Sequence, residues 1–141
     1  MRLTTMRTMR MVALAALFAA AGCSSSKKAA DATFVKPTLD GKVTDHGSKD
    51  IAGATEVTLE ADDFYFAPTF IKAAPGSTIT VHLKNESKSQ HTFTSTALKI
   101  DQTLDPDQKV DVKVTLPASG PTPFFCRFHQ STGMQGAFVV S

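Results

Sequence analysis

Residues 78–85 read TITVHLKN, and every second side chain from Ile79 to Leu83 is apolar. Residues 109–116, KVDVKVTL, show the same alternation. Because successive side chains of a β-strand point to opposite faces of the sheet, each stretch predicts a strand with one buried face. Similar short runs occur from residue 55 to the end, separated by turn residues, and none of them favours a helix. We therefore predict an all-β domain over residues 55–141, a sandwich or barrel of seven to eight strands.

The length and charge of the chain limit what else it can contain. Its 141 residues are typical of one domain with additional processing or linker sequence. The net charge of +2 depends on Arg2, Arg7 and Arg10, which lie in a leader that has no acidic residue. Without residues 1–22, the 15 basic residues fall to 12 against 13 acidic ones, a net charge of −1. The rest of the chain therefore has no basic excess, and we expect no nucleic-acid partner.

The first 22 residues have the organisation of an export signal. A basic segment precedes an apolar run of 11 residues, Met11 to Ala21, whereas about 20 are needed to span a bilayer. Ala20-Ala21-Gly22 and then Cys23 resemble the lipobox of bacterial lipoproteins. This resemblance implies cleavage before Cys23, lipidation of its sulfur and a membrane anchor. The alternative is an ordinary signal peptide cut after Ala21 or Gly22, and both alternatives predict an exported protein facing the periplasm or the cell exterior.

Residues 23–54 are rich in Ser, Lys, Ala, Asp and Gly and contain few apolar side chains. This composition predicts a flexible tether, and a coil of this length has an r.m.s. reach of roughly 30 Å. Part of residues 34–43 could instead pack as an additional edge segment of the sheet. The expected organisation is thus a signal peptide at 1–22, a tether at 23–54 and a folded domain at 55–141.

The two cysteines of the chain, Cys23 and Cys126, allow at most one disulfide. If Cys23 carries lipid, Cys126 has no partner, and a lone thiol in an oxidising compartment favours metal ligation or reactivity. Cys126, His129 and Met134 follow one another as C-x2-H-x4-M between two predicted strands, and His91 follows an upstream turn. A thiolate, two imidazoles and a thioether are the donors of a type 1 copper site. The same residues could also bind zinc, and each of them alone would more often be an ordinary core or surface residue.

From residue 55 onward the chain resembles the cupredoxins, the small blue copper proteins, and in particular their plastocyanin-like branch. The resemblance rests on these segments in this order: Phe64-Tyr65-Phe66-Ala67-Pro68, Ile71, Gly76-Ser77-Thr78-Ile79, Asn85, His91-Thr92-Phe93, Phe125-Cys126, His129 and Met134. It implies an eight-stranded Greek-key sandwich that binds one copper ion and transfers one electron between Cu(I) and Cu(II). The family's ligands correspond to His91, Cys126, His129 and Met134. Thr92 differs from the family pattern, because plastocyanins commonly have Asn at this position beside the thiolate.

A copper ion held by three short bonds and a distant thioether has no vacant position for a substrate. We therefore expect an electron-transfer protein and no enzyme. Cys126 lies between Phe125 and Arg127 and lacks the flanking histidines that lead to further coppers in multicopper oxidases. Its partners would be redox proteins of unknown identity, and we expect a monomer. Two alternatives stay open: a lipoprotein that binds or delivers copper without carrying electrons, and an adhesion or scaffold sandwich that holds no metal.

Overall fold

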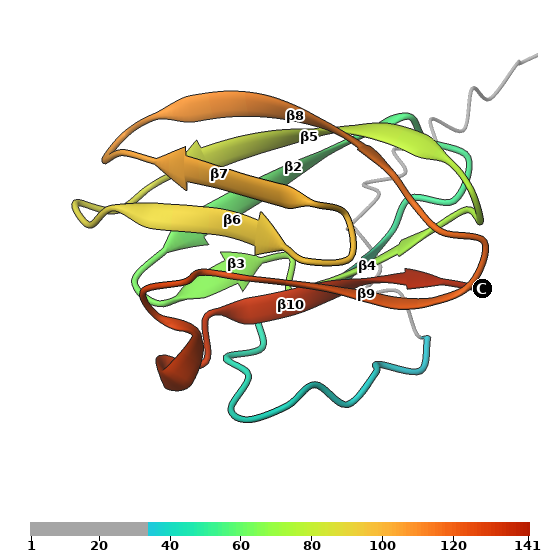
Figure 1. The fold of residues 1–141 in the computed structure, drawn as a ribbon, viewed down its shortest axis with the longest axis horizontal. Helices are drawn as coiled ribbons and strands as arrows, with labels where there is room; N and C mark the ends of the chain where they lie inside the picture. The colour runs from blue at the N-terminus through green and yellow to red at the C-terminus, as the bar shows by residue number, and fades with distance from the viewer. Residues whose placement is uncertain (1–33) are drawn as a thin grey trace, which may run out of the picture.

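The computed structural model of the protein describes residues 34–141, which form two β-sheets packed face to face (Figure 1). The six-stranded sheet has the order β1-β4-β10-β9-β6-β7, and the four-stranded sheet has the order β3-β2-β5-β8. The elements are β1 (Ser48–Asp50), β2 (Glu56–Asp62), β3 (Tyr65–Ala67), β4 (Phe70–Ala73), β5 (Thr78–Asn85), β6 (His91–Ser95), β7 (Ile100–Leu104), β8 (Lys109–Thr115), β9 (Gly120–Phe125), a 3-10 helix η1 (Gln130–Thr132) and β10 (Gln135–Val140). The predicted all-β sandwich is confirmed. Ten strands replace the expected seven to eight, partly because the three-residue strands β1 and β3 are too short to show an alternating pattern.

The alternating stretch at residues 78–85 forms the centre of the four-stranded sheet. β5 pairs in parallel with β2, where Val81 lies opposite Val57, and antiparallel with β8, where Val81 lies opposite Val112. Every second residue of β2 and β5 is buried, as the pattern predicts. The buried face of this sheet packs against the six-stranded sheet, which closes the core between the two layers.

Four phenylalanines with no exposed surface fill the middle of this core. The Phe124 ring on β9 lies 5.3 Å from Phe66, 5.2 Å from Phe93 and 5.3 Å from Phe138 between ring centroids. Burying an aromatic side chain of this size contributes roughly 1.5–3 kcal/mol to the free energy of unfolding. Because alternation along the chain continues past β9, Cys126 is directed into the same interior as Phe124, at the end of the sandwich.

The described chain packs against the sandwich upstream of residue 55, which differs from the expected boundary between tether and domain. β1 pairs in parallel with β4, and Ile51, next to β1, is only 5% exposed. Upstream of β1, the backbone N–H of Thr44 donates to the carbonyl of Gly133 at 2.9 Å. Strand pairing, backbone hydrogen bonds and the buried Ile51 therefore dock a segment that is polar in composition. The expected signal peptide and Cys23 lie outside the described residues.

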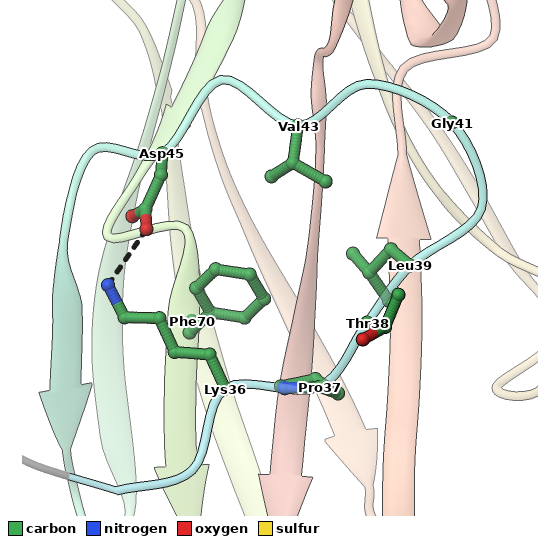
Figure 2. A pocket seen from close by; sticks show the side chains of 8 residues that line it. All are labelled: Lys36, Pro37, Thr38, Leu39, Gly41, Val43, Asp45 and Phe70. Atoms are coloured by element: carbon green, nitrogen blue, oxygen red, sulfur yellow. Dashed lines mark hydrogen bonds and ion pairs between the residues drawn. The ribbon is translucent and has the colours of Figure 1, made fainter.

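Residues 36–45 arch over the six-stranded sheet and line a solvent-open pocket of about 370 Å³ (Figure 2). Lys36 closes one side, with its Nζ 2.8 Å from Asp45 Oδ2 and 5.6 Å from the centre of the Phe70 ring. The pocket is lined by Lys36, Pro37, Thr38, Leu39, Gly41, Val43, Asp45 and Phe70. None of the predicted metal ligands is among these residues. No helix within residues 34–141 has the length and apolar character needed to cross a membrane.

Candidate metal centre

Three of the four predicted ligands lie on the loop that joins β9 to β10. The loop is closed by backbone hydrogen bonds: Cys126 N–H donates to the Met134 carbonyl at 3.0 Å, and Met134 N–H donates to the His129 carbonyl at 3.1 Å. Between them, Gly133 adopts a left-handed conformation with φ 109° and ends η1. A Cβ at this position would also lie 2.5 Å from Thr44 Oγ1, so the upstream segment packs tightly against the loop. These contacts tie the two ends of the loop together and pack the loop against the upstream segment.

The structure brings His91, the first residue of β6, to this loop from the neighbouring part of the sheet. His91 Nδ1 lies 3.8 Å from Cys126 Sγ and 3.2 Å from His129 Nδ1, and Cys126 Sγ lies 3.6 Å from His129 Nδ1. The centre of a triangle with these edges is about 2 Å from each corner, which is close to the length of metal–ligand bonds to imidazole and thiolate. Among residues 34–141 this is the group of His, Cys and carboxylate side chains arranged to hold a metal ion.

Met134 lies at the same end of the sandwich and has no exposed surface. Its backbone bonds to Cys126 and His129 place it directly beside two members of the triangle. Its thioether therefore remains the candidate for a fourth donor. The other two described histidines lie elsewhere: His82 on the outer face of β5 contacts Asp111 and Glu56, and His46 stacks on Tyr65.

Thr92 supports the thiol from the adjacent strand. Its backbone N–H lies 3.4 Å from Cys126 Sγ and donates to it. Its side-chain Oγ1 accepts the N–H of Arg127 at 2.9 Å and the hydroxyl of Thr94 at 3.0 Å. Thr92 thus fixes the backbone of Arg127, the residue that follows the thiol. At the position where plastocyanins commonly have Asn, a threonine hydroxyl makes this contact.

The environment of His91 favours the neutral form of its imidazole. Burial disfavours the charged imidazolium and holds the pKa of His91 below its usual value, and repulsion from His129 lowers that pKa further, while Asp63 acts in the opposite direction. A neutral imidazole has one ring nitrogen with a free lone pair, which is the form that ligates a metal. Nε2 of His91 faces Ser87 Oγ at 2.9 Å and Asp63 Oδ1 at 3.3 Å, so Nδ1 is the nitrogen directed at the triangle.

His129 is the predicted ligand nearest to solvent, and two phenylalanine rings lie beside it. The Phe64 ring lies 4.3 Å from the His129 ring, and the Phe128 ring lies 6.2 Å from it, between centroids. Phe64 and Phe128 are 39% and 50% exposed, which is unusual for phenylalanine in a domain that buries most of its aromatic side chains. The result is an apolar rim around a partly exposed imidazole.

Sequence reasoning missed the roles of Asp63, Phe64 and Ser87 at this site. Asp63 and Phe64 lie in the turn between β2 and β3, and Ser87 lies in the turn after β5. Both segments could be recognised as turns from their residue types. Nothing local to either turn, however, indicates that it lies beside His91, because that proximity depends on how distant strands pair.

Two sheets of this topology with a buried thiol and two imidazoles at one end define an all-β sandwich with a candidate site for a single metal ion. The chain belongs to the family of cupredoxin-like domains, whose family model matches residues 11–140. The family and the donor set together identify one copper ion as the cofactor.

Solved structures share this fold. An auracyanin from Roseiflexus castenholzii is 20% identical with a TM-score of 0.54, and the match covers 62% of this chain and 98% of the auracyanin. The metal-binding domain of a Cu(I)-exporting P-type ATPase from Streptococcus pneumoniae D39 is 15% identical with a TM-score of 0.54, covering 61% and 84%. The periplasmic domain of cytochrome oxidase subunit II from Bradyrhizobium japonicum is 11% identical with a TM-score of 0.54, covering 62% and 83%. No curated protein sequence matches the chain.

Proposed function

We propose that the protein is an extracytoplasmic electron carrier with a type 1 copper site formed by His91, Cys126, His129 and Met134. The observation that carries this proposal is the triangle of one cysteine sulfur and two imidazole nitrogens, two of whose three residues, His91 and Cys126, are buried. When copper is bound, it supplies a one-electron couple between Cu(I) and Cu(II). The chain holds three of these donors in a closed loop braced by Thr92 and the fourth, His91, on β6, so the ligands need to move little when the charge of the site changes.

The exposed edge of His129 is the proposed point of electron entry and exit. Its apolar rim of Phe64 and Phe128 offers a small surface on which a redox partner can dock closely and exclude water. Small interfaces of this kind suit weak, transient encounters between electron carriers. The partner proteins would therefore recognise this end of the sandwich.

Burial of the donors favours electron transfer over copper delivery. Cys126, Met134 and His91 have no exposed surface, so handing copper to another protein requires the β9–β10 loop to open. An electron can leave through the His129 ring with the loop closed. The same burial disfavours an enzymatic role, because three of the four proposed donors are shielded from solvent.

We also propose that the mature protein is anchored to the membrane by lipid on Cys23. The lipobox-like sequence at residues 20–23 supports this, and two acyl chains give stable anchoring where one is marginal. Cell fractionation tests it: the protein should sediment with membranes, and Cys23→Ser should move it to the soluble exported fraction. Retention of the Cys23→Ser variant on membranes would contradict lipid anchoring.

Copper addition to the purified protein tests the site, and kinetics test the role. An intense thiolate-to-Cu(II) absorption band and narrow EPR hyperfine splitting are expected, with one copper per chain. Fast electron exchange with slow release of Cu(I) to a chelator supports the carrier. Rapid Cu(I) transfer with sluggish electron exchange would favour delivery, and the absence of stoichiometric metal would favour a scaffold function.

Replacing Met134 with glutamine should shift the reduction potential without unfolding the domain. A thioether favours Cu(I), whereas an amide oxygen is a harder donor that favours Cu(II), so the potential should fall. Voltammetry of the copper-loaded variant measures the shift, and the exposed loop variant Ser131→Ala serves as the control. An unchanged potential in Met134→Gln would remove Met134 from the ligand set.

A further inference from the structure

A chain of hydrogen bonds behind His91 begins at Asn85, the last residue of β5. The side chain of Asn85 is buried, and its Nδ2 donates to the carbonyls of Ser89, Leu104 and Asp105 at 2.8, 3.1 and 3.0 Å. Carbonyl oxygens can only accept hydrogen bonds, so the atom of the Asn85 amide that faces these three carbonyls is its nitrogen. Its Oδ1 therefore faces Ser87, where it accepts the backbone N–H at 3.0 Å and the hydroxyl at 2.9 Å.

The hydrogen bonds of Ser87 determine which of its groups faces His91. Its hydroxyl has one proton, and both Asn85 Oδ1 and the Ser89 carbonyl stand within 3.1 Å to accept it. With the proton given to either of them, Ser87 Oγ faces His91 Nε2 at 2.9 Å as an acceptor. This geometry favours a proton on Nε2.

Asp63 reinforces this assignment from the turn between β2 and β3. Its Oδ1 lies 3.3 Å from the same Nε2, and an ionised carboxylate can only accept a hydrogen bond. A lone pair on Nε2 would face this negative charge, which is unfavourable. Two oxygens from different turns therefore converge on one N–H, and the lone pair of the neutral ring is left on Nδ1, toward Cys126 and His129.

We infer that Asp63 is a positioning residue that, together with Ser87, fixes the Nε2–H tautomer of His91 and lowers the reduction potential of the bound copper. A carboxylate that accepts the outer N–H of a metal-bound imidazole raises the basicity of the ligating nitrogen. A more basic ligand stabilises Cu(II) relative to Cu(I). Because Asp63 is 40% exposed, solvent weakens its charge, and the effect is moderate. The inference about the potential rests on the proposed function, whereas the inference about the tautomer does not.

Replacing Asp63 with asparagine tests the effect on the potential. At a fixed ambient potential, the ratio of Cu(I) to Cu(II) should rise about three- to tenfold, which corresponds to roughly 30–60 mV for a one-electron couple. The matched control is Asp62→Asn, which removes the same charge one residue away. Asp62 accepts the Tyr65 hydroxyl at 3.2 Å and the backbone N–H of Asp63 at 2.8 Å, and asparagine keeps an oxygen that can accept this N–H. A much smaller shift is expected for this control. Equal shifts in both variants, or no shift in Asp63→Asn, would overturn the role of Asp63.

The tautomer is tested separately in the metal-free protein by 15N NMR. His91 should show a protonated Nε2 that exchanges slowly with water and an unprotonated Nδ1. Ser87→Ala and Asp63→Asn should each speed this exchange, and thermal unfolding of both variants reports whether the fold is kept. A proton on Nδ1 in the wild-type protein would overturn the inference even if the copper site is blue. A protein with the expected tautomer but no blue copper would instead refute the proposed function alone.

Discussion

Cys126→Ala should abolish the blue copper spectrum and lower the affinity for copper by more than about 100-fold. Changes to the groups around a metal's ligands already cost 10- to 100-fold in affinity, and this change removes the only thiolate donor of the described site. The intense band depends on charge transfer from that sulfur, so it should be absent even at saturating copper. Titration followed by absorption and EPR spectroscopy measures both effects.

The domain should remain folded in this variant, because Cys126 is small, buried and free of any disulfide among the described residues. Removing its sulfur leaves a small cavity next to Thr92, which costs about 1–2 kcal/mol of stability. Ser131→Ala, an exposed change in the same loop, is the control and should keep the wild-type spectrum. A Cys126→Ala protein that still turns blue with copper would refute the site and, with it, the electron-carrier proposal.

The strands that form the middle of the sandwich could be predicted because their evidence is local. The alternation of residues 78–85 requires only that one face be buried, and β5 has those bounds. The loop motif is local as well, since Cys126, His129 and Met134 lie within nine residues. The proximity of His91 to that loop was expected from the family resemblance, and the structure places its Nδ1 within 3.8 Å of the thiol sulfur.

The surroundings of His91 could not be predicted because they depend on pairing between distant strands. Asp63 reaches His91 only because β2 lies in parallel beside β5, which aligns the turn after β2 with the turn after β5. The docking of residues 44–51 escaped prediction for another reason. Its bonds to the sandwich come largely from backbone groups, such as Thr44 N–H, which leave no trace in side-chain composition.

Gly136→Ala should be among the most destabilising single changes in the described domain. Gly136 lies near the start of β10, and a Cβ there would lie 2.2 Å from the Thr69 carbonyl oxygen and 2.8 Å from two atoms of the Phe124 ring. Neither the Thr69 carbonyl nor the Phe124 ring can move away at low energetic cost. Thr69 O accepts the N–H of Ala137 at 3.1 Å, and the Phe124 ring is enclosed by three other phenylalanines. We expect a loss of about 3 kcal/mol or more in the free energy of unfolding, at the upper end of overpacking effects.

Chemical denaturation of the metal-free protein measures this loss, and Gly76→Ala provides the matched control. Gly76 has a positive φ of 64°, but a Cβ there would meet no atom within 4 Å, so alanine costs only the strain of a left-handed residue, about 1–2 kcal/mol. A Gly136→Ala chain that fails to fold, or that unfolds at much lower denaturant than Gly76→Ala, supports the tight contact. Equal stability of the two variants would show that β10 can move away from Thr69 and Phe124. Such movement would also displace Met134, two residues upstream, and so disturb the proposed copper site.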